Sequence, residues 1–123
     1  LLRSAGCRVV GTDVDPNKFA LASTMGAEAV GSAAAIHEML SRLSPSGGAD
    51  SVIITASTAS SAPLVLASEV ARDRAKVVAV GAVGLKVPRR EFYEKELELV
   101  VSRSYGPGRY DSRYEEDGTD YPI

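Results

Sequence analysis

The sequence is poor in the residues that most often bind metals: its 123 residues include one cysteine and one histidine. With Cys7 alone, no disulfide can form within the chain and no zinc site can be built from its cysteines. We interpret Cys7 as a small residue at the entrance to a strand. His37 lies in a predicted exposed helix, and we expect neither metal binding nor base catalysis from it. The chain is therefore not expected to hold a metal of its own.

Long apolar runs and an excess of charge of one sign are also missing. No run reaches the roughly 18 apolar residues of a membrane helix, and no basic segment followed by an apolar core indicates a signal peptide. A formal net charge of −2 argues against a nucleic-acid partner. We therefore expect a cytoplasmic protein with neither a membrane nor a nucleic-acid partner. A length of 123 residues suits one domain.

Short apolar runs alternate with helical patterns along the chain, which is typical of repeated β-α-β units and a parallel sheet. The predicted strands cover residues 8–13, 27–30, 50–55, 76–81 and 97–102. The predicted helices cover residues 16–25, 33–43, 63–71 and a short turn at 92–96. Continuous apolar character predicts burial on both faces for the strand at 50–55 and again for the strand at 76–81. The strand at 97–102 alternates in its first half, which indicates the sheet edge.

A carboxylate stands at the tip of the first predicted strand. Asp13 is followed by Asp15 and Pro16, an N-cap residue and a first helical residue. A carboxylate in this place can accept hydrogen bonds from both hydroxyls of an adenosine ribose, and its charge repels a 2′-phosphate, so it favours NAD over NADP. An acid here also suits a methyltransferase that binds the ribose of S-adenosylmethionine.

The glycine-rich turn that accompanies such an acid is absent. In a dinucleotide-binding unit it lies about 20 residues upstream, whereas only twelve residues precede Asp13 and they are predicted to be a helix tail and the strand itself. The sequence thus predicts a Rossmann-type doubly wound parallel sheet, truncated at its N-terminus, without its first strand and glycine turn. In the strand order 3-2-1-4-5-6 the strands at 8–13 and 50–55 would each lack a neighbour. We expect this chain alone to be poorly stable and to bind NAD weakly.

Small and polar residues follow the strand at 50–55. Ligands bind at the carboxyl ends of open parallel sheets, so the segment 56–61 is either a cofactor contact or a turn with an N-cap. Gly81, at the tip of the next strand, permits close approach of a cofactor or serves a turn. The acidic pairs Glu94 with Glu96 and Glu115 with Glu116 have no nucleophile or metal beside them, so we interpret them as surface charges and predict no catalytic residue here.

Several segments in order resemble the medium-chain, zinc-type alcohol dehydrogenases over roughly residues 1–105. They are residues 11–22 followed by Met25-Gly26-Ala27, residues 48–54, residues 77–81 and residues 95–97. More specifically, Asp73-Arg74, residues 92–97 and residues 102–110 resemble a bacterial subgroup in which such a module precedes a glucose-fructose-oxidoreductase-type module.

The resemblance implies a set of cofactor-binding residues. They are Asp13 at the ribose, Lys18 beside it, Thr55, Ala56 and Ser57 in the loop after the fourth strand of the family, Val80, Gly81 and Ala82 against the nicotinamide carboxamide, and Tyr105 where the chain leaves the domain. It also implies a partial cofactor domain at residues 1–104 and a connection at residues 105–123.

By the same resemblance, the whole protein is an oxidoreductase. Hydride would pass between NAD, less readily NADP, and a small alcohol or carbonyl substrate, with zinc in a catalytic domain outside this chain. The chain alone would be inactive, and homo-oligomerisation is left open. A methyltransferase or a non-catalytic nucleotide-binding module are the alternatives.

Overall fold

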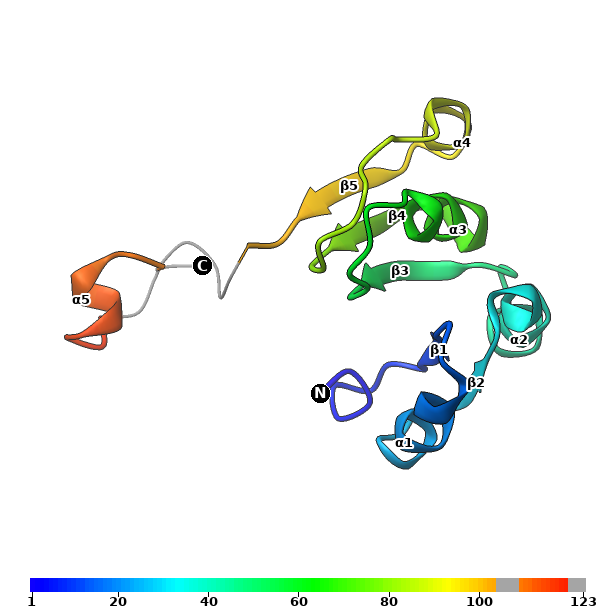
Figure 1. Ribbon diagram of the computed structural model, residues 1–123, viewed down its shortest axis with the longest axis horizontal. Coiled ribbons are helices and arrows are strands. Elements are labelled where there is room, and N and C mark those ends of the chain that lie inside the picture. The colour runs from blue at the N-terminus through cyan, green and yellow to red at the C-terminus, as the bar shows by residue number, and fades with distance from the viewer. Residues whose placement is uncertain (104–108, 120–123) are drawn as a thin grey trace.

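The computed structural model describes residues 1–103 and 109–119, and it contains two parallel sheets with helices between the strands (Figure 1). The strands are β1 (Val10–Thr12), β2 (Ala29–Gly31), β3 (Ala49–Ile54), β4 (Ala71–Ala79) and β5 (Glu98–Val101). The α-helices are α1 (Phe19–Thr24), α2 (Ile36–Leu43), α3 (Ala62–Val70), α4 (Arg89–Glu94) and α5 (Ser112–Glu115), and 3-10 turns precede α1 at Pro16–Lys18 and α2 at Ala33–Ala35. The α/β class and the parallel strands confirm the predicted Rossmann-type fold.

The two sheets are not joined by a strand ladder. β1 pairs with β2, whereas β3, β4 and β5 form a separate sheet in that order, with β5 at its edge as predicted. The expectation that the strands now seen as β1 and β3 would each lack a neighbour is confirmed for the described part of the chain. Helix α2 bridges the sheets, because Ile36 and Leu40 pack with Val10 of β1 and Val52 of β3.

The core of the larger sheet lies under α3. Leu64 of this helix and Val77 of β4 are fully buried, and they form one cluster with Ile54 of β3. Because α3 packs on one face of this sheet, only that face is buried from solvent.

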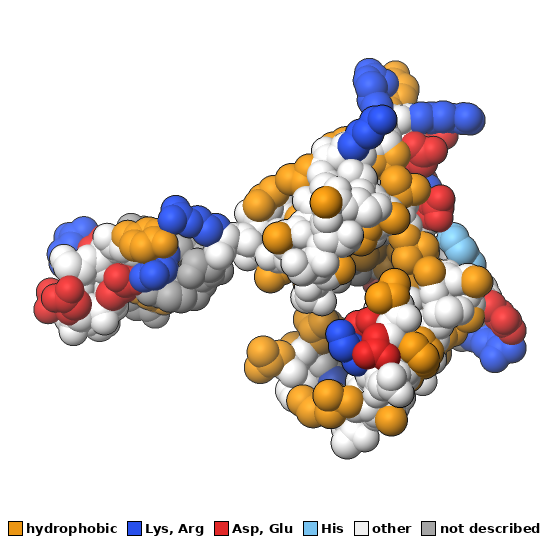
Figure 2. Space-filling model, in the orientation of Figure 1, with side chains coloured by type: hydrophobic (Ala, Val, Ile, Leu, Met, Phe, Trp, Pro, Cys, Tyr) orange, Lys and Arg blue, Asp and Glu red, His pale blue; other side chains and the backbone are white. Residues whose placement is uncertain are grey.

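The opposite face of the larger sheet is largely uncovered in the part of the chain that the structure describes. Ile53, Val78 and Val100 lie in register across β3, β4 and β5, and Ile53 is 45% and Val100 40% exposed. The prediction that the strand at 50–55 is buried on both faces is therefore wrong for this chain, because apolar sequence alone does not supply a second covering layer. Figure 2 shows hydrophobic side chains on the molecular surface around this sheet.

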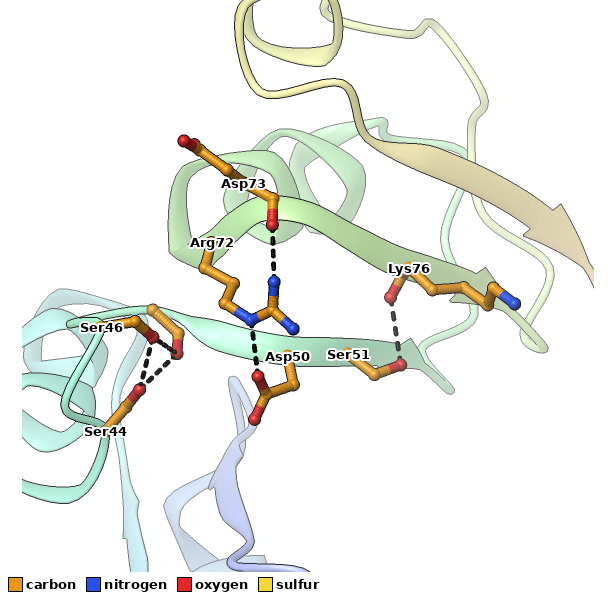
Figure 3. A network of polar contacts seen from close by, with 8 residues as sticks. Ser44, Ser46, Asp50, Ser51, Arg72, Asp73 and Lys76 are labelled. Carbon is orange, nitrogen blue, oxygen red and sulfur yellow. Dashed lines mark hydrogen bonds and ion pairs between the residues drawn. The ribbon is translucent and has the colours of Figure 1, made fainter.

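Strand β4 begins five residues earlier than predicted, because an irregular segment precedes its regular part. Ala49 pairs with Ala71, whereas Ser51 pairs with Lys76, so β4 gains three extra residues here. Arg72 spans the irregularity: its Nε lies 2.5 Å from Asp50 Oδ1, and its guanidinium also donates to the Asp73 carbonyl at 2.8 Å (Figure 3). The charged residues at 72–74 interrupt the apolar pattern, so the sequence did not predict that β4 begins at Ala71.

Lys95, at the end of α4, closes the end of α3. Its Nζ donates to the carbonyl oxygens of Ser68, Glu69 and Ala71 at 2.8, 2.9 and 2.9 Å. The last carbonyls of a helix have no partner within it, and a lysine ammonium suits their partial negative charge. This residue thus links α4 to the helix that covers the sheet.

The described residues nearest the two ends lie outside the sheets. Residues 2–6 form a hydrogen-bonded turn where the tail of a helix was predicted, with Ala5 N donating to Leu1 O at 3.0 Å. Helix α5 stands apart from both sheets (Figure 1), so the segment after Ser104 contributes no strand within the residues that are described. In the same residues, no helix is long and apolar enough to cross a membrane.

Candidate functional site

The carboxylate of Asp13 lies directly after β1, where a local turn holds it. Its Oδ1 accepts a hydrogen bond from the Asp15 backbone N–H at 2.9 Å, and the side chain is 36% exposed. This backbone hydrogen bond, assisted by the charge of Lys18, lowers the pKa of Asp13 from its ordinary value of 3.8. Asp13 is therefore an anion at neutral pH, and its Oδ2 takes no part in the turn bond.

Lys18 is brought to the same place by the start of the next helical segment. The Asp15 side chain caps that segment by accepting from Asn17 N at 3.0 Å, and Pro16 occupies the first turn, both as predicted. As a result Lys18 Nζ lies 3.6 Å from Asp13 Oδ2. Gly26, with φ of +99°, follows the helix as the predicted terminator. Asp13 and Lys18 form an exposed pair that can present an acceptor and a donor to one ligand.

Two loops meet at the carboxyl end of the larger sheet. We call residues 55–61 the β3–α3 loop and residues 80–88 the β4–α4 loop. The backbone N–H groups of Val80 and Gly81 both donate to the Ile54 carbonyl at 2.9 Å. The predicted residues of these loops, Thr55, Ala56, Ser57, Val80, Gly81 and Ala82, are thereby brought together, and all but Gly81 are exposed.

Gly81 is required by the packing of the loops themselves. A Cβ at this position would overlap the Ala56 carbonyl oxygen and would lie 2.7 Å from the Thr55 carbonyl carbon. The close approach at Gly81 is therefore that of the β3–α3 loop, whose backbone occupies the space that a side chain would need. The backbone of both loops remains at the sheet edge.

The Asp13–Lys18 pair and the two loops lie on different sheets. Figure 2 shows a hollow between the half of the molecule that carries β1 and β2 and the half that carries β3 to β5, with acidic and basic side chains at its rim. Tyr105, the remaining predicted site residue, lies outside the described residues. The arrangement offers one charged pair and one edge of exposed backbone.

Sequence reasoning missed two residues of the loop contact, Gly84 and Lys86. Ser61 Oγ accepts a hydrogen bond from Lys86 N at 3.0 Å, and a Cβ on Gly84 would lie 2.7 Å from that Oγ. The serine-rich segment predicted an N-cap; Ser61 is the N-cap residue of α3 but makes no side-chain cap bond, and Ser60 Oγ accepts from Ala62 N at 3.1 Å instead. The contact with Lys86 joins residues 25 positions apart, so no local sequence pattern could predict it.

No group of three or more His, Cys, Asp and Glu side chains within the described ranges is arranged to hold a metal ion. Cys7 is exposed, and His37 lies exposed on α2. The donor atoms that the structure describes therefore do not fit a zinc centre.

The chain matches one protein-family model, that of the zinc-binding dehydrogenases, over residues 1–116. No curated protein sequence matches it. Similar solved structures include D-arabinose dehydrogenase from Sulfolobus solfataricus, with a TM-score of 0.77, 15% identity and coverage of 95% of this chain and 38% of that one. Quinone oxidoreductase from Thermus thermophilus, solved alone and with NADPH, gives a TM-score of 0.71, 22% identity and coverage of 94% and 36%. Alcohol dehydrogenase from Aeropyrum pernix gives a TM-score of 0.68, 22% identity and coverage of 83% of this chain and 30% of that one. The chain thus spans about a third of the length of these proteins.

Proposed function

The chain belongs to the zinc-binding dehydrogenase family, and from that premise we propose that it forms the cofactor-holding face of an oxidoreductase. Hydride would pass between a nicotinamide cofactor and a small alcohol or carbonyl substrate. The observation that carries the proposal is the ionised Asp13 carboxylate at the tip of β1, paired with Lys18 at 3.6 Å. The chain itself supplies binding and orientation and no catalytic residue.

Asp13 would bind the adenosine ribose. Both hydroxyls of a ribose can donate to a carboxylate, and one carboxylate oxygen is not engaged by the turn bond from Asp15. The negative charge disfavours a 2′-phosphate, so NAD is the expected cofactor and NADP the weaker one. Lys18 would add a donor beside the same ribose.

The two loops would receive the nicotinamide half. Thr55, Ala56 and Ser57 stand at the end of β3, and Val80, Gly81 and Ala82 at the end of β4. Ligands bind at the carboxyl ends of strands in open parallel sheets, and these loops present exposed residues there. We assign Tyr105 to the same end of the site by its position in the family pattern alone.

Zinc, which the family name implies, does not fit the donor groups described in this chain. We assign it to a catalytic domain outside residues 1–123, and we derive no step of the reaction through it. Residues 1–104 would then be the cofactor domain and residues 105–123 a connection, which limited proteolysis should cut first. Cleavage within residues 50–81 before the connection would contradict this division.

We further propose that the chain comes from the subgroup in which a glucose-fructose-oxidoreductase-type module follows. Asp73-Arg74, residues 92–97 and residues 102–110 carry this resemblance. The reading frame downstream of Ile123 tests it, because a second dinucleotide-binding unit is expected there and its absence would remove the subgroup assignment. A cytoplasmic location is part of the same proposal.

The function is tested by titrating the natural full-length protein with NAD, NADP and S-adenosylmethionine in a calorimeter. We expect NAD to bind more tightly than NADP and S-adenosylmethionine not to bind. Asp13→Ala should weaken NAD binding about tenfold and narrow the preference over NADP, because charge-assisted hydrogen bonds are the strong ones. Asp73→Ala, which removes an exposed aspartate near the start of β4 in the other sheet, is the matched control.

Equal NAD affinities in wild type and Asp13→Ala would refute the assignment of the ribose site. Tight binding of S-adenosylmethionine without NAD binding would favour the methyltransferase instead. Binding of NAD without turnover of any alcohol or carbonyl would indicate a non-catalytic nucleotide-binding module.

A further inference from the structure

The β3–α3 and β4–α4 loops are joined along their length by hydrogen bonds. Thr58 N donates to the Ala82 carbonyl at 2.9 Å, and Gly84 N donates to the Ser60 carbonyl at 3.1 Å. Thr58 and Val83 also form an isolated parallel bridge. The two loops therefore behave as one unit at the edge of the sheet, although they lie far apart along the chain.

One side chain, that of Ser61, closes this unit at its far end. Its Oγ accepts from Lys86 N at 3.0 Å and lies against Gly84, where a Cβ would approach it to 2.7 Å. Ser61 is half-buried and is the N-cap residue of α3. Leu64 in the first turn of that helix is fully buried in the core, so the start of α3, and with it Ser61, is held in place by packing.

Val83 of the β4–α4 loop packs against the core cluster of Leu64 and Val77, but beyond Gly84 this loop has little other support. Its first residues are held by the Ile54 carbonyl, but Leu85 is 45% and Val87 is 42% exposed. A loop segment whose side chains are exposed, such as residues 85–87, depends on its hydrogen bonds for its position. The bond from Lys86 to Ser61 fixes the part of the loop that the strand end does not reach.

We propose that Ser61 is a positioning residue for the nicotinamide cofactor. Together with the backbone bonds of Val80 and Ala82, it ties the β4–α4 loop to the other loop and to the start of α3, and so keeps the exposed residues Val80 and Ala82 in one arrangement. This inference rests on the proposed cofactor function of the two loops. Ser61 acts through the loop and needs no contact with the cofactor itself.

The test is steady-state kinetics of Ser61→Ala in the natural full-length protein. Loss of one hydrogen bond of ordinary strength should raise the KM for NAD about fivefold, with kcat and the melting temperature close to wild type. Ser41→Ala is the matched control, because its side chain donates to the Glu38 carbonyl at 2.8 Å within α2 and lies outside both loops. That control should leave the KM for NAD within about twofold of wild type.

Gly84→Ala approaches the same contact from the other side. Its Cβ would lie 2.6 Å from the Ala59 carbonyl oxygen and 2.7 Å from Ser61 Oγ, so the loops must move apart. We expect a KM increase at least as large as that of Ser61→Ala, and a combined increase in the double variant smaller than the product of the two, because both act on one contact.

The outcomes separate this inference from the proposed function. If Asp13→Ala weakens NAD binding while Ser61→Ala and Ser41→Ala give equal KM values for NAD, the positioning role is wrong and the cofactor site stands. If none of these variants changes NAD binding, the cofactor assignment itself fails. A Ser61→Ala protein that does not fold, or a double variant whose increases multiply, would also overturn the positioning role.

Discussion

At the scale of single residues, the environment of Asp13 determines its charge. The Asp15 N–H and the Lys18 ammonium both favour the ionised form and lower the pKa of this carboxyl. A carboxylate whose pKa is lowered on folding contributes stability at pH values above its unfolded pKa, and this contribution is lost as the pH falls through the lower folded pKa. Asp13 therefore stays ionised throughout the range of about pH 5 to 8.

We predict that the Asp13 side-chain carboxyl signal in carbon NMR titrates with a midpoint below 3.8, because its pKa is lowered from that value. Lys18→Met should raise the midpoint toward the ordinary value, because it removes the charge while the Asp15 bond remains. NAD affinity should be flat across the range in which Asp13 stays ionised. A midpoint above 3.8 in the wild type would contradict the turn geometry at the tip of β1.

Gly81 is the residue at which the loops tolerate substitution least. Gly81→Ala would place a methyl group against the Ala56 carbonyl oxygen and 2.7 Å from the Thr55 carbonyl carbon, and both of these are backbone atoms. We expect a loss of about 1–3 kcal/mol in the free energy of unfolding, the usual cost of overpacking. Gly11→Ala is the control, because its Cβ would meet only the Val30 side chain at 3.8 Å, an ordinary contact.

Chemical denaturation monitored by circular dichroism provides the measurement for both glycine variants. A Gly81→Ala protein as stable as Gly11→Ala would mean that the two loops are not packed as described. It would also return Gly81 to its other interpretation, a glycine needed for approach of the cofactor.

At the scale of elements, the stability of α3 depends on a residue from the end of α4. Lys95 donates hydrogen bonds to three carbonyls at the end of α3. A hydrogen bond from a charged donor stabilises the folded state by about 1.5–3 kcal/mol, and removing the donor also leaves the carbonyl acceptors unpaired. Lys95→Met keeps the aliphatic stem and removes the donors. We expect the free energy of unfolding to fall by about 2 kcal/mol.

Lys76→Met is the matched control for this prediction. Lys76 is 53% exposed and its Nζ lies 3.4 Å from Glu98 Oε2, a surface ion pair of the kind that contributes about 0–1 kcal/mol. Denaturant titration of both variants measures the difference. If Lys95→Met were no more destabilising than Lys76→Met, the link between α4 and the end of α3 would have no energetic weight.

At the scale of the whole molecule, two sheets share one bridging helix. β1 and β3 each expose one row of backbone donors and acceptors, since they lie in different sheets, and one face of the larger sheet is uncovered. Such edges and faces invite association and add little stability. The contacts through Ile36 and Leu40 of α2 are the apolar connection between the halves.

We therefore predict that residues 1–123, expressed alone, are poorly stable and bind NAD weakly. Thermal unfolding should lack a cooperative transition in the range of about 45–65 °C that is usual for mesophilic domains. Calorimetry should find no micromolar NAD binding, because no glycine turn at a helix N-terminus is present in the sequence to hold the pyrophosphate. A sharp transition in that range together with micromolar affinity would show that the two sheets are sufficient.

The sequence by itself determined the features that depend on neighbours along the chain. Asp15 and Pro16 start a helical segment because a side-chain cap and a fixed φ act over a few neighbouring residues, and Gly26 ends it. The same locality placed Asp13 at the end of a strand and brought Lys18 back beside it. Alternating strands and helices likewise implied a parallel α/β fold, because parallel strands need a crossover between them.

Only the tertiary structure decided the features that join distant segments. The Ser61–Lys86 bond, the Arg72–Asp50 pair and the Lys95 contact with Ser68 connect residues 25, 22 and 27 positions apart, and no local pattern encodes such pairs. The exposed face at Ile53 was missed for the same reason: an apolar strand is buried only where another layer covers it, and the layer comes from elsewhere in the fold. Gly81 was found from the sequence, but the backbone that excludes its side chain belongs to the other loop.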